Sequence, residues 1–175
     1  NKVPKPYILE RSAEMSTQFY EFNLSNPLFG PDAKGLKVRQ AISYAIDREK
    51  LIEKVLSGEA YGPGIHGITP PSFREYDNSK IQGYSYDPEK AKQLLAAAGY
   101  PDGENFPTIK LELNSGGFRN TSIAFEVQKQ LSNSESLFHT SGISLYIFLS
   151  NFPQIRNFQC CLHNFFALFF IGDSF

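Results

Sequence analysis

The chain has 175 residues, of which 41% are hydrophobic and 20% are charged, and its formal net charge is −1. This length is sufficient for one domain with a buried core. The near-neutral charge excludes strong electrostatic binding to nucleic acid, because no basic surplus exists to neutralise phosphates. We therefore expect no nucleic-acid partner.

Charge and aromatic residues are distributed unevenly along the chain. After Leu131 the sequence holds nine of the 16 phenylalanines and both cysteines, but only three charged residues: Glu135, Arg156 and Asp173. A folded domain rarely changes composition so abruptly. We interpret residues 132–175 as an atypical Phe-rich tail, translated out of frame or otherwise unrelated to residues 17–131. Residues 1–16 read as a connecting segment.

The first regular element is expected at Thr17–Leu24, where aromatic residues dominate an alternating pattern that is typical of a strand. A loop rich in proline and glycine follows at Ser25–Gly35. A second such loop spans Glu59–Pro71. Loops of this kind lie at the surface, where binding residues concentrate.

Two short helices in tandem are predicted within Leu36–Gly58. Apolar residues recur there at helical spacing, first from Val38 to Ile46 and then from Leu51 to Leu56. Asp47 separates the two series and is a suitable N-cap for the second helix, because its carboxylate can accept free backbone N–H groups. Gly58 is expected to close the pair.

Three further elements complete the regular part of the chain. Asp87 is expected to cap a helix that starts at Pro88 and ends at Gly99. Thr108–Asn114 alternates apolar and polar residues and predicts a half-buried strand, and Arg119–Leu131 predicts an amphipathic helix. Strands alternating with amphipathic helices favour an α/β fold.

Three motifs, taken in order, resemble one family. They are FN at Phe22-Asn23, VRQAISYAIDREKLIEKVLSGEAYGPG from Val38, and YDPEKAKQLLAAAGYPDG from Tyr86. Over about Phe19–Leu131 the chain resembles the extracytoplasmic solute-binding proteins of peptide and nickel ABC transporters. The resemblance implies an α/β fold, here an incomplete part of one lobe of a type II, two-lobe periplasmic-binding-protein fold.

The resemblance also implies where a ligand would bind. In that family the strand at Thr17–Leu24 crosses between the lobes as part of the hinge, and the loop after the helix pair approaches the ligand cleft. The matching positions are Tyr20, Phe22, Asn23, Tyr61, Gly62 and Pro63. The alternatives are an ordinary core strand and a rigid connecting loop without ligand contact.

The implied function is capture of a solute, preferentially a peptide, for import by an ABC transporter. Hinge closure would trap the ligand, and the closed form would dock on the permease subunits. Nickel complexes or another small solute are the alternative ligands, and a truncated product without function is a different reading of the chain. The resemblance implies a periplasmic or membrane-anchored extracytoplasmic location and no cofactor.

Catalytic and metal-binding patterns are weak. The sequence contains no G-x-S-x-G elbow and no phosphate-binding loop, so we expect no enzyme activity. Cys160-Cys161-x-His163 does not supply the four preorganised ligands of a structural zinc site. The Asp-Tyr motif, whose acidic residue anchors the peptide amino terminus in the resembling family, does not occur.

The sequence starts at Asn1 and shows no signal peptide before Tyr7. We therefore expect that an N-terminal signal or lipoprotein segment, which could provide membrane anchoring, is missing. The apolar run Phe158–Ile171 is shorter than the ~20 residues that span a bilayer, and we do not predict a transmembrane helix there.

Overall fold

The computed structural model describes residues 4–8, 17–60, 62–70, 73, 75–113, 117–132, 143–147 and 166–171, the last two ranges by their backbone alone. In chain order the regular elements are β1 (Gln18–Glu21), η1 (Pro27–Phe29), α1 (Ala33–Ala45), α2 (Arg48–Lys54), η2 (Asn78–Lys80), α3 (Pro88–Ala97), η3 (Pro101–Gly103), β2 (Ile109–Leu113), α4 (Gly117–Ser132), β3 (Ile143–Ile147) and β4 (Phe166–Ile171).

The helix pair α1–α2 confirms the tandem pattern read from the sequence. Asp47 caps α2 by accepting a hydrogen bond from the backbone N–H of Lys50 at 2.9 Å. α1 begins three residues before Leu36, because Asp32 caps it by accepting from the N–H of Gly35 at 2.7 Å. An added Cβ at that glycine would collide with the carbonyl oxygen of the preceding loop, so the close approach requires glycine.

The helix α3 also follows its sequence signals. The side chain of Asp87 accepts from the N–H of Lys90 at 2.9 Å, and Gly99 adopts a φ of +92° just after the helix. A positive φ of this size is the conformation in which glycine closes a helix without side-chain strain. The predicted start and end of this helix are therefore confirmed.

The four strands form two separate parallel ladders. β1 pairs with β4, and β2 pairs with β3 in a regular register from Ile109 opposite Ile143 to Leu113 opposite Ile147. β1 is shorter than the predicted Thr17–Leu24. In β2 the side chains alternate as expected, with Leu113 buried and the charged residues exposed.

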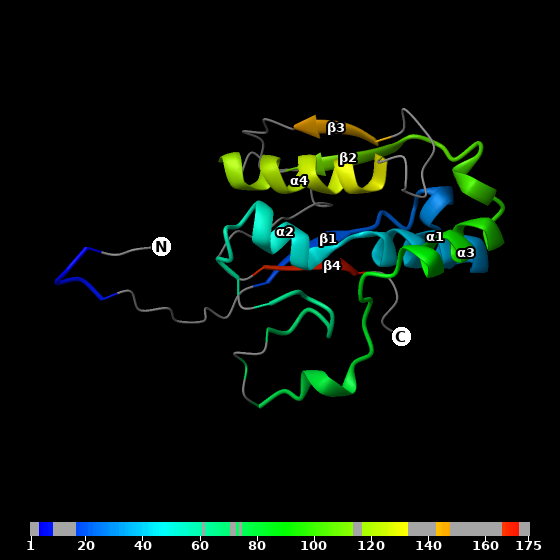
Figure 1. The fold of residues 1–175 in the computed structure, drawn as a ribbon. Helices are drawn as coiled ribbons and strands as arrows, with labels where there is room; N and C mark the ends of the chain where they lie inside the picture. The colour runs from blue at the N-terminus through cyan, green and yellow to red at the C-terminus, as the bar shows by residue number, and fades with distance from the viewer. Residues whose placement is uncertain are drawn as a thin grey trace.

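In Figure 1 the ladder of β2 and β3 lies above the ladder of β1 and β4. α4 contacts β2 and β3 on one side and α1 and α2 on the other, and α1 also packs along α3. The described residues 4–8 extend away from this body (Figure 1). The arrangement is an α/β layer structure, as the order of elements predicted.

Within the part of the chain that the structure describes, one apolar core joins the helices. It includes the predicted inward faces of all four, and its largest fully buried side chains are Val38, Ile46, Leu51, Leu95 and Ile123. Burying one such side chain contributes roughly 1.5–3 kcal/mol. The core therefore rests on residues whose spacing in the sequence already placed them on one helix face.

Two of the strands, β3 and β4, lie within the segment 132–175 that we set apart by composition. β3 pairs with β2 and β4 pairs with β1, so these two strands lie beside the rest of the fold. The out-of-frame origin of the segment stays a prediction. Among the described residues, no helix combines the length and the apolar character needed to cross a membrane.

Candidate functional site

The first candidate site is a cavity of about 380 Å³ between β1 and β2, which we call the β1–β2 cavity. Three predicted site residues, Tyr20, Phe22 and Asn23, line it. The other lining residues are Glu21, Asn26, Leu28, Phe29, Ile42, Thr108, Ile109, Lys110, Leu111, Glu112, Val127 and Leu131. Residues of the strand that we interpreted as the hinge strand therefore line this cavity.

The cavity has an apolar interior and a charged rim. Its inner wall contains the buried side chains of Ile42, Val127 and Leu131, which come from α1 and α4. The half-buried ring of Phe22 packs on Phe29, with ring centroids 5.0 Å apart and an angle of 46° between the planes. Such tilted aromatic contacts are favourable beyond the area that they bury.

Polar contacts hold β1 and the residue before it at both sides. Thr17 donates its hydroxyl to the carbonyl oxygen of Ile68 at 2.7 Å, and Gln18 donates its amide to the Oδ1 atom of Asn120 at 2.8 Å. Asn120 lies on α4 and is only 3% exposed. The strand is thereby connected to the loop after α2 and to α4, two elements that the sequence did not show to be its neighbours.

Asn23 takes part in a turn of its own chain. Its Oδ1 atom accepts a hydrogen bond from the N–H of Ser25 at 3.0 Å, and its carbonyl oxygen accepts from the N–H of Asn26. This is an Asx-turn, which redirects the chain after β1. The carbonyl oxygen of the Asn23 side chain therefore has a structural role in addition to its place at the cavity.

The loop residues of the predicted site lie elsewhere. Gly62 and Pro63 line a wide, shallow hollow beside α2, together with Glu49, Ile52, Glu53, Ser57 and Gly58. Tyr61 lies outside the described residues. The structure thus brings Tyr20, Phe22 and Asn23 to one cavity and Gly62 and Pro63 to another, and the β1–β2 cavity includes neither Gly62 nor Pro63.

The long loop between α2 and α3 is attached to the helix pair by Arg48, which sequence reasoning did not single out. Its guanidinium donates to the carbonyl oxygens of Ser43, Ile46 and Tyr84 at 3.1–3.2 Å. Arg48 is 3% exposed, and burial lowers its pKa to about 10. No local pattern marks this role, because one of the three acceptors lies 36 residues away.

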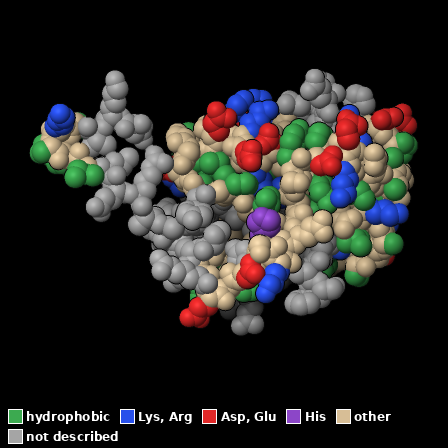
Figure 2. All heavy atoms as spheres, turned by 60° about the horizontal axis from the view of Figure 1, so that its bottom comes forward, with side chains coloured by type: hydrophobic (Ala, Val, Ile, Leu, Met, Phe, Trp, Pro, Cys, Tyr) green, Lys and Arg blue, Asp and Glu red, His purple; other side chains and the backbone are tan. Residues whose placement is uncertain are grey.

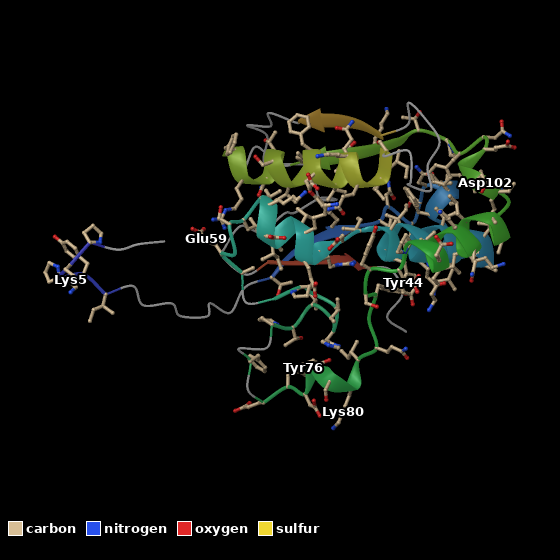
Figure 3. All side chains as sticks on the ribbon, in the orientation of Figure 1. Lys5, Tyr44, Glu59, Tyr76, Lys80 and Asp102 are labelled. Carbon is tan, nitrogen blue, oxygen red and sulfur yellow. The ribbon has the colours of Figure 1, made fainter. Side chains whose placement is uncertain are left out.

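The ends of this loop are anchored and its middle projects. Glu59, at its start, forms an ion pair of 2.8 Å with Arg119 of α4, and the N–H of Asp87 donates to the carbonyl oxygen of Tyr44. Tyr76 lies in the projecting part beside η2, away from α1–α4 (Figure 3). The loop is therefore fixed at both ends and, through Ile68, to Thr17, while the part around Tyr76 projects.

The described surface carries mixed charges, and its described residues form no metal-ligand cluster. Figure 2 shows basic and acidic side chains interspersed on one face, which agrees with the small net charge. Among the described residues, no group of three or more His, Cys, Asp and Glu side chains could hold a metal ion. Cys160, Cys161 and His163 lie outside the described residues.

The chain is similar in fold to solved periplasmic binding proteins. AgaA of A. tumefaciens R10, solved with agropinic acid, matches 74% of this chain and 23% of its own, with a TM-score of 0.53 and 32% identity. DppA of Helicobacter pylori, an ABC transporter-associated protein solved with the peptide STSA, matches 72% of this chain and 21% of its own, with a TM-score of 0.54 and 27% identity. The α/β arrangement is therefore part of a periplasmic-binding-protein lobe, as predicted.

The sequence comparison is more specific. Residues 1–134 match the model of the family described as bacterial extracellular solute-binding proteins, family 5 middle. Heme-binding protein A of Haemophilus influenzae is 43% identical over 100 residues, which are 57% of this chain and 17% of that protein. The chain belongs to this family of extracellular solute-binding proteins, which confirms the resemblance seen in the motifs. It spans less than a quarter of each of these three relatives.

Proposed function

We propose that the chain serves solute capture for import by an ABC transporter, and that its solute is a peptide. The observation that carries this proposal is the family match over residues 1–134, which includes the proposed hinge strand and the three helices α1, α2 and α3 that carry the motifs. The relatives bind different solutes by name, a heme in one case and agropinic acid in another. The peptide-bound DppA structure supports the choice of a peptide.

Tyr20, Phe22 and Asn23 are the residues that we propose for contact with the solute from the hinge, and Tyr61, Gly62 and Pro63 from the loop. The half-buried aromatic rings beside a charged rim suit a peptide, whose side chains need apolar contact while its main chain needs hydrogen bonds. Solutes in such sites are also held through water, which tolerates different side chains. ABC-transporter permease subunits are the proposed protein partners.

A hybrid protein tests this function. Residues 17–131 would replace the matching segment of the H. pylori DppA protein, and calorimetry would measure binding of the peptide STSA. We expect the hybrid to bind, and Phe22→Ala to weaken binding by roughly tenfold through loss of apolar contact. Phe125→Ala is the matched control, because Phe125 is an exposed residue of α4 that lines neither cavity.

The hybrid's circular dichroism and melting curve establish whether it folds. A folded hybrid that does not bind STSA would reject the peptide proposal. Equal binding by the Phe22→Ala and Phe125→Ala hybrids would remove Phe22 from the proposed site and leave the family assignment intact.

A further inference from the structure

Three lysines lie along the contact between α1 and α3, and we call Lys34, Lys37 and Lys90 the lysine row. Two of them belong to α1. The Nζ atom of Lys34 lies 4.6 Å from the ring centroid of Tyr100, and Lys37 donates to the carbonyl oxygen of Ala97 at 3.3 Å. Ala97 is the last residue of α3, and Tyr100 follows that helix. The N-terminal half of α1 therefore lies beside the C-terminal end of α3.

The third member of the row, Lys90, is in the first turn of α3. Its Nζ atom donates to the hydroxyl oxygen of Tyr44 at 2.7 Å and lies 4.3 Å from the centroid of that ring. Tyr44 is in the last turn of α1, so the two helices run antiparallel, side by side (Figure 1). With a rise of 1.5 Å per residue, the row is about 15 Å long, and its two intervals along α1 are about 4.5 and 10.5 Å.

The positive charge of the row is not neutralised by nearby helix residues. α1 contains no acidic residue, and the single one of α3, Glu89, forms an ion pair with Lys92 at 3.4 Å. The helix caps Asp32 and Asp87 accept hydrogen bonds from backbone N–H groups. Among the described residues, no carboxylate forms an ion pair with a lysine of the row. This edge of the α1–α3 pair is therefore a cationic surface.

The contacts of the row hold each lysine and leave N–H donors available. An ammonium group has three donors. Lys37 and Lys90 each use one of them in the hydrogen bonds above, and Lys34 lies over a ring face, which attracts a cation electrostatically. A long side chain that is already held loses less rotamer freedom when a partner binds. The row is thus partly preorganised for an anionic partner.

The surface between the two ends of the row is narrow and partly apolar. On α3, Leu94 and Ala97 follow Lys90 at i+4 and i+7, so they share its face. Leu94 is half-buried and Ala97 is exposed. On α1, the half-buried Gln40 follows Lys37 at i+3. A partner that combines a small apolar stripe with carboxylates beside it would fit this edge, and an amphipathic helix offers that combination.

We propose that the lysine row is a docking surface for an acidic amphipathic helix of a protein partner. Carboxylates at i, i+3 and i+10 of such a helix lie on one face, and their spacing along the axis reproduces the two intervals of the row. An anionic membrane fits less well, because none of the large apolar side chains that the described structure exposes lies in α1 or α3 to enter the lipid. The row lines neither hollow, so this proposal goes beyond the proposed function and does not depend on it.

The experiment titrates the full chain with a capped helical peptide of about 18 residues, built from alanine and glutamine with glutamates at i, i+3 and i+10. We expect saturable one-to-one binding in calorimetry, with a dissociation constant on the order of 100 μM or lower at low salt. The combined variant Lys34→Gln, Lys37→Gln and Lys90→Gln should bind roughly tenfold more weakly or less. Circular dichroism and melting curves establish that the variant folds.

The matched control variant combines Lys50→Gln, Lys54→Gln and Lys129→Gln. These lysines are exposed on α2 and α4, and their replacement changes the net charge by the same amount. We expect its affinity to stay within about twofold of the unchanged chain, because the bound helix does not reach these positions. A control peptide with glutamine in place of the three glutamates needs no variant of the chain, and it should not bind.

The outcomes separate a specific docking surface from general charge attraction. Weaker binding of the row variant alone, with no binding of the glutamine peptide, supports the proposal. Equal losses in the two combined variants would overturn it, as would equal binding of a peptide whose three glutamates lie on different helix faces. No binding at millimolar concentration would also overturn it. Binding to phosphatidylserine–phosphatidylcholine vesicles through the row, without binding of the acidic peptide, would assign this edge to a membrane and reject the protein partner.

Discussion

The side-chain amide of Gln130 pairs with the main chain of Asp47 as one peptide group pairs with another. Its Oε1 atom accepts from the N–H of Asp47 at 2.9 Å, and its Nε2 atom donates to the carbonyl oxygen of Asp47 at 3.2 Å. Asp47 caps α2 and lies two residues after the last residue of α1, Ala45. The junction that organises the helix pair is therefore fixed by a residue near the end of α4, 83 positions away.

Gln130→Ala should lower the free energy of unfolding by about 1–3 kcal/mol, because it leaves a partly buried donor and acceptor of Asp47 without partners. Chemical denaturation with circular dichroism measures the change. Gln93→Ala on the exposed side of α3 is the matched control and should change stability by less than about 0.5 kcal/mol. Equal effects of the two variants would show that the pair with Asp47 contributes nothing.

Ala45→Asp should unfold the helix pair. Ala45 is 6% exposed and belongs to the apolar core, so the substitution buries an unpaired carboxylate. We expect a loss of several kcal/mol, measured from the melting curve. Ala96→Asp, at an exposed position of α3, should cost less than about 1 kcal/mol. Its carboxylate stays in water, and only the unfavourable interaction of a negative charge with the C-terminal end of the helix dipole remains. A melting curve unchanged by Ala45→Asp would disprove the assigned face of α1.

Asp87→Ala should cost about 1 kcal/mol, because the N–H of Lys90 loses the carboxylate that caps α3. Asp87→Asn keeps an acceptor at the same atom and should recover most of this loss. Glu89→Ala removes only an exposed pair with Lys92 and serves as the control. If the alanine and asparagine variants of Asp87 were equally stable, the cap would not contribute and α3 would be held by packing alone.

Local signals account for what the sequence predicted well. The helix pair, α3, α4 and β2 follow from apolar spacing. Asp47 and Asp87 are recognisable as caps because each accepts a hydrogen bond from the backbone N–H of the residue three positions later. The lengths of β1 and of α1 were less accurate, because Asp32 and the close approach at Gly35 decide where α1 begins.

Contacts between distant residues were not predictable in this way. Gln18 and Asn120 are 102 residues apart, and Arg48 reaches Tyr84 across the long loop. Buried polar residues of this kind have no period, and their partners become adjacent only when the core has formed. The same limit explains why the sequence did not show that Tyr20, Phe22 and Asn23 lie at one hollow and Gly62 and Pro63 at another, since these residues were grouped by resemblance alone.

Arg48→Met should destabilise the chain by about 2–4 kcal/mol, because two buried carbonyl oxygens and one partly buried carbonyl oxygen lose a charged donor. Hydrogen exchange should increase most in residues 81–87, where the loop meets the helix pair through the carbonyl oxygen of Tyr84. Lys50→Met removes a positive charge from the exposed side of α2 and controls for net charge. Uniformly faster exchange, without a local effect at 81–87, would mean that Arg48 supports the helices and does not anchor the loop.

The isolated 175-residue chain should not bind tri- to pentapeptides with micromolar affinity. The chain spans less than a quarter of its solved relatives, and hinge closure requires a second lobe across the ligand. The proposed hinge residues and the described loop residues Gly62 and Pro63 lie at separate hollows. Calorimetry with a mixed peptide pool, on the chain and on a version ending at Leu131, measures this directly.

Saturable micromolar binding by both would show that residues 17–131 suffice for capture. Binding that disappears on truncation would instead give residues 132–175 a function and contradict their interpretation as out of frame. A heat signal that does not saturate, seen with the longer version alone, would indicate nonspecific association through exposed apolar surface of the Phe-rich tail.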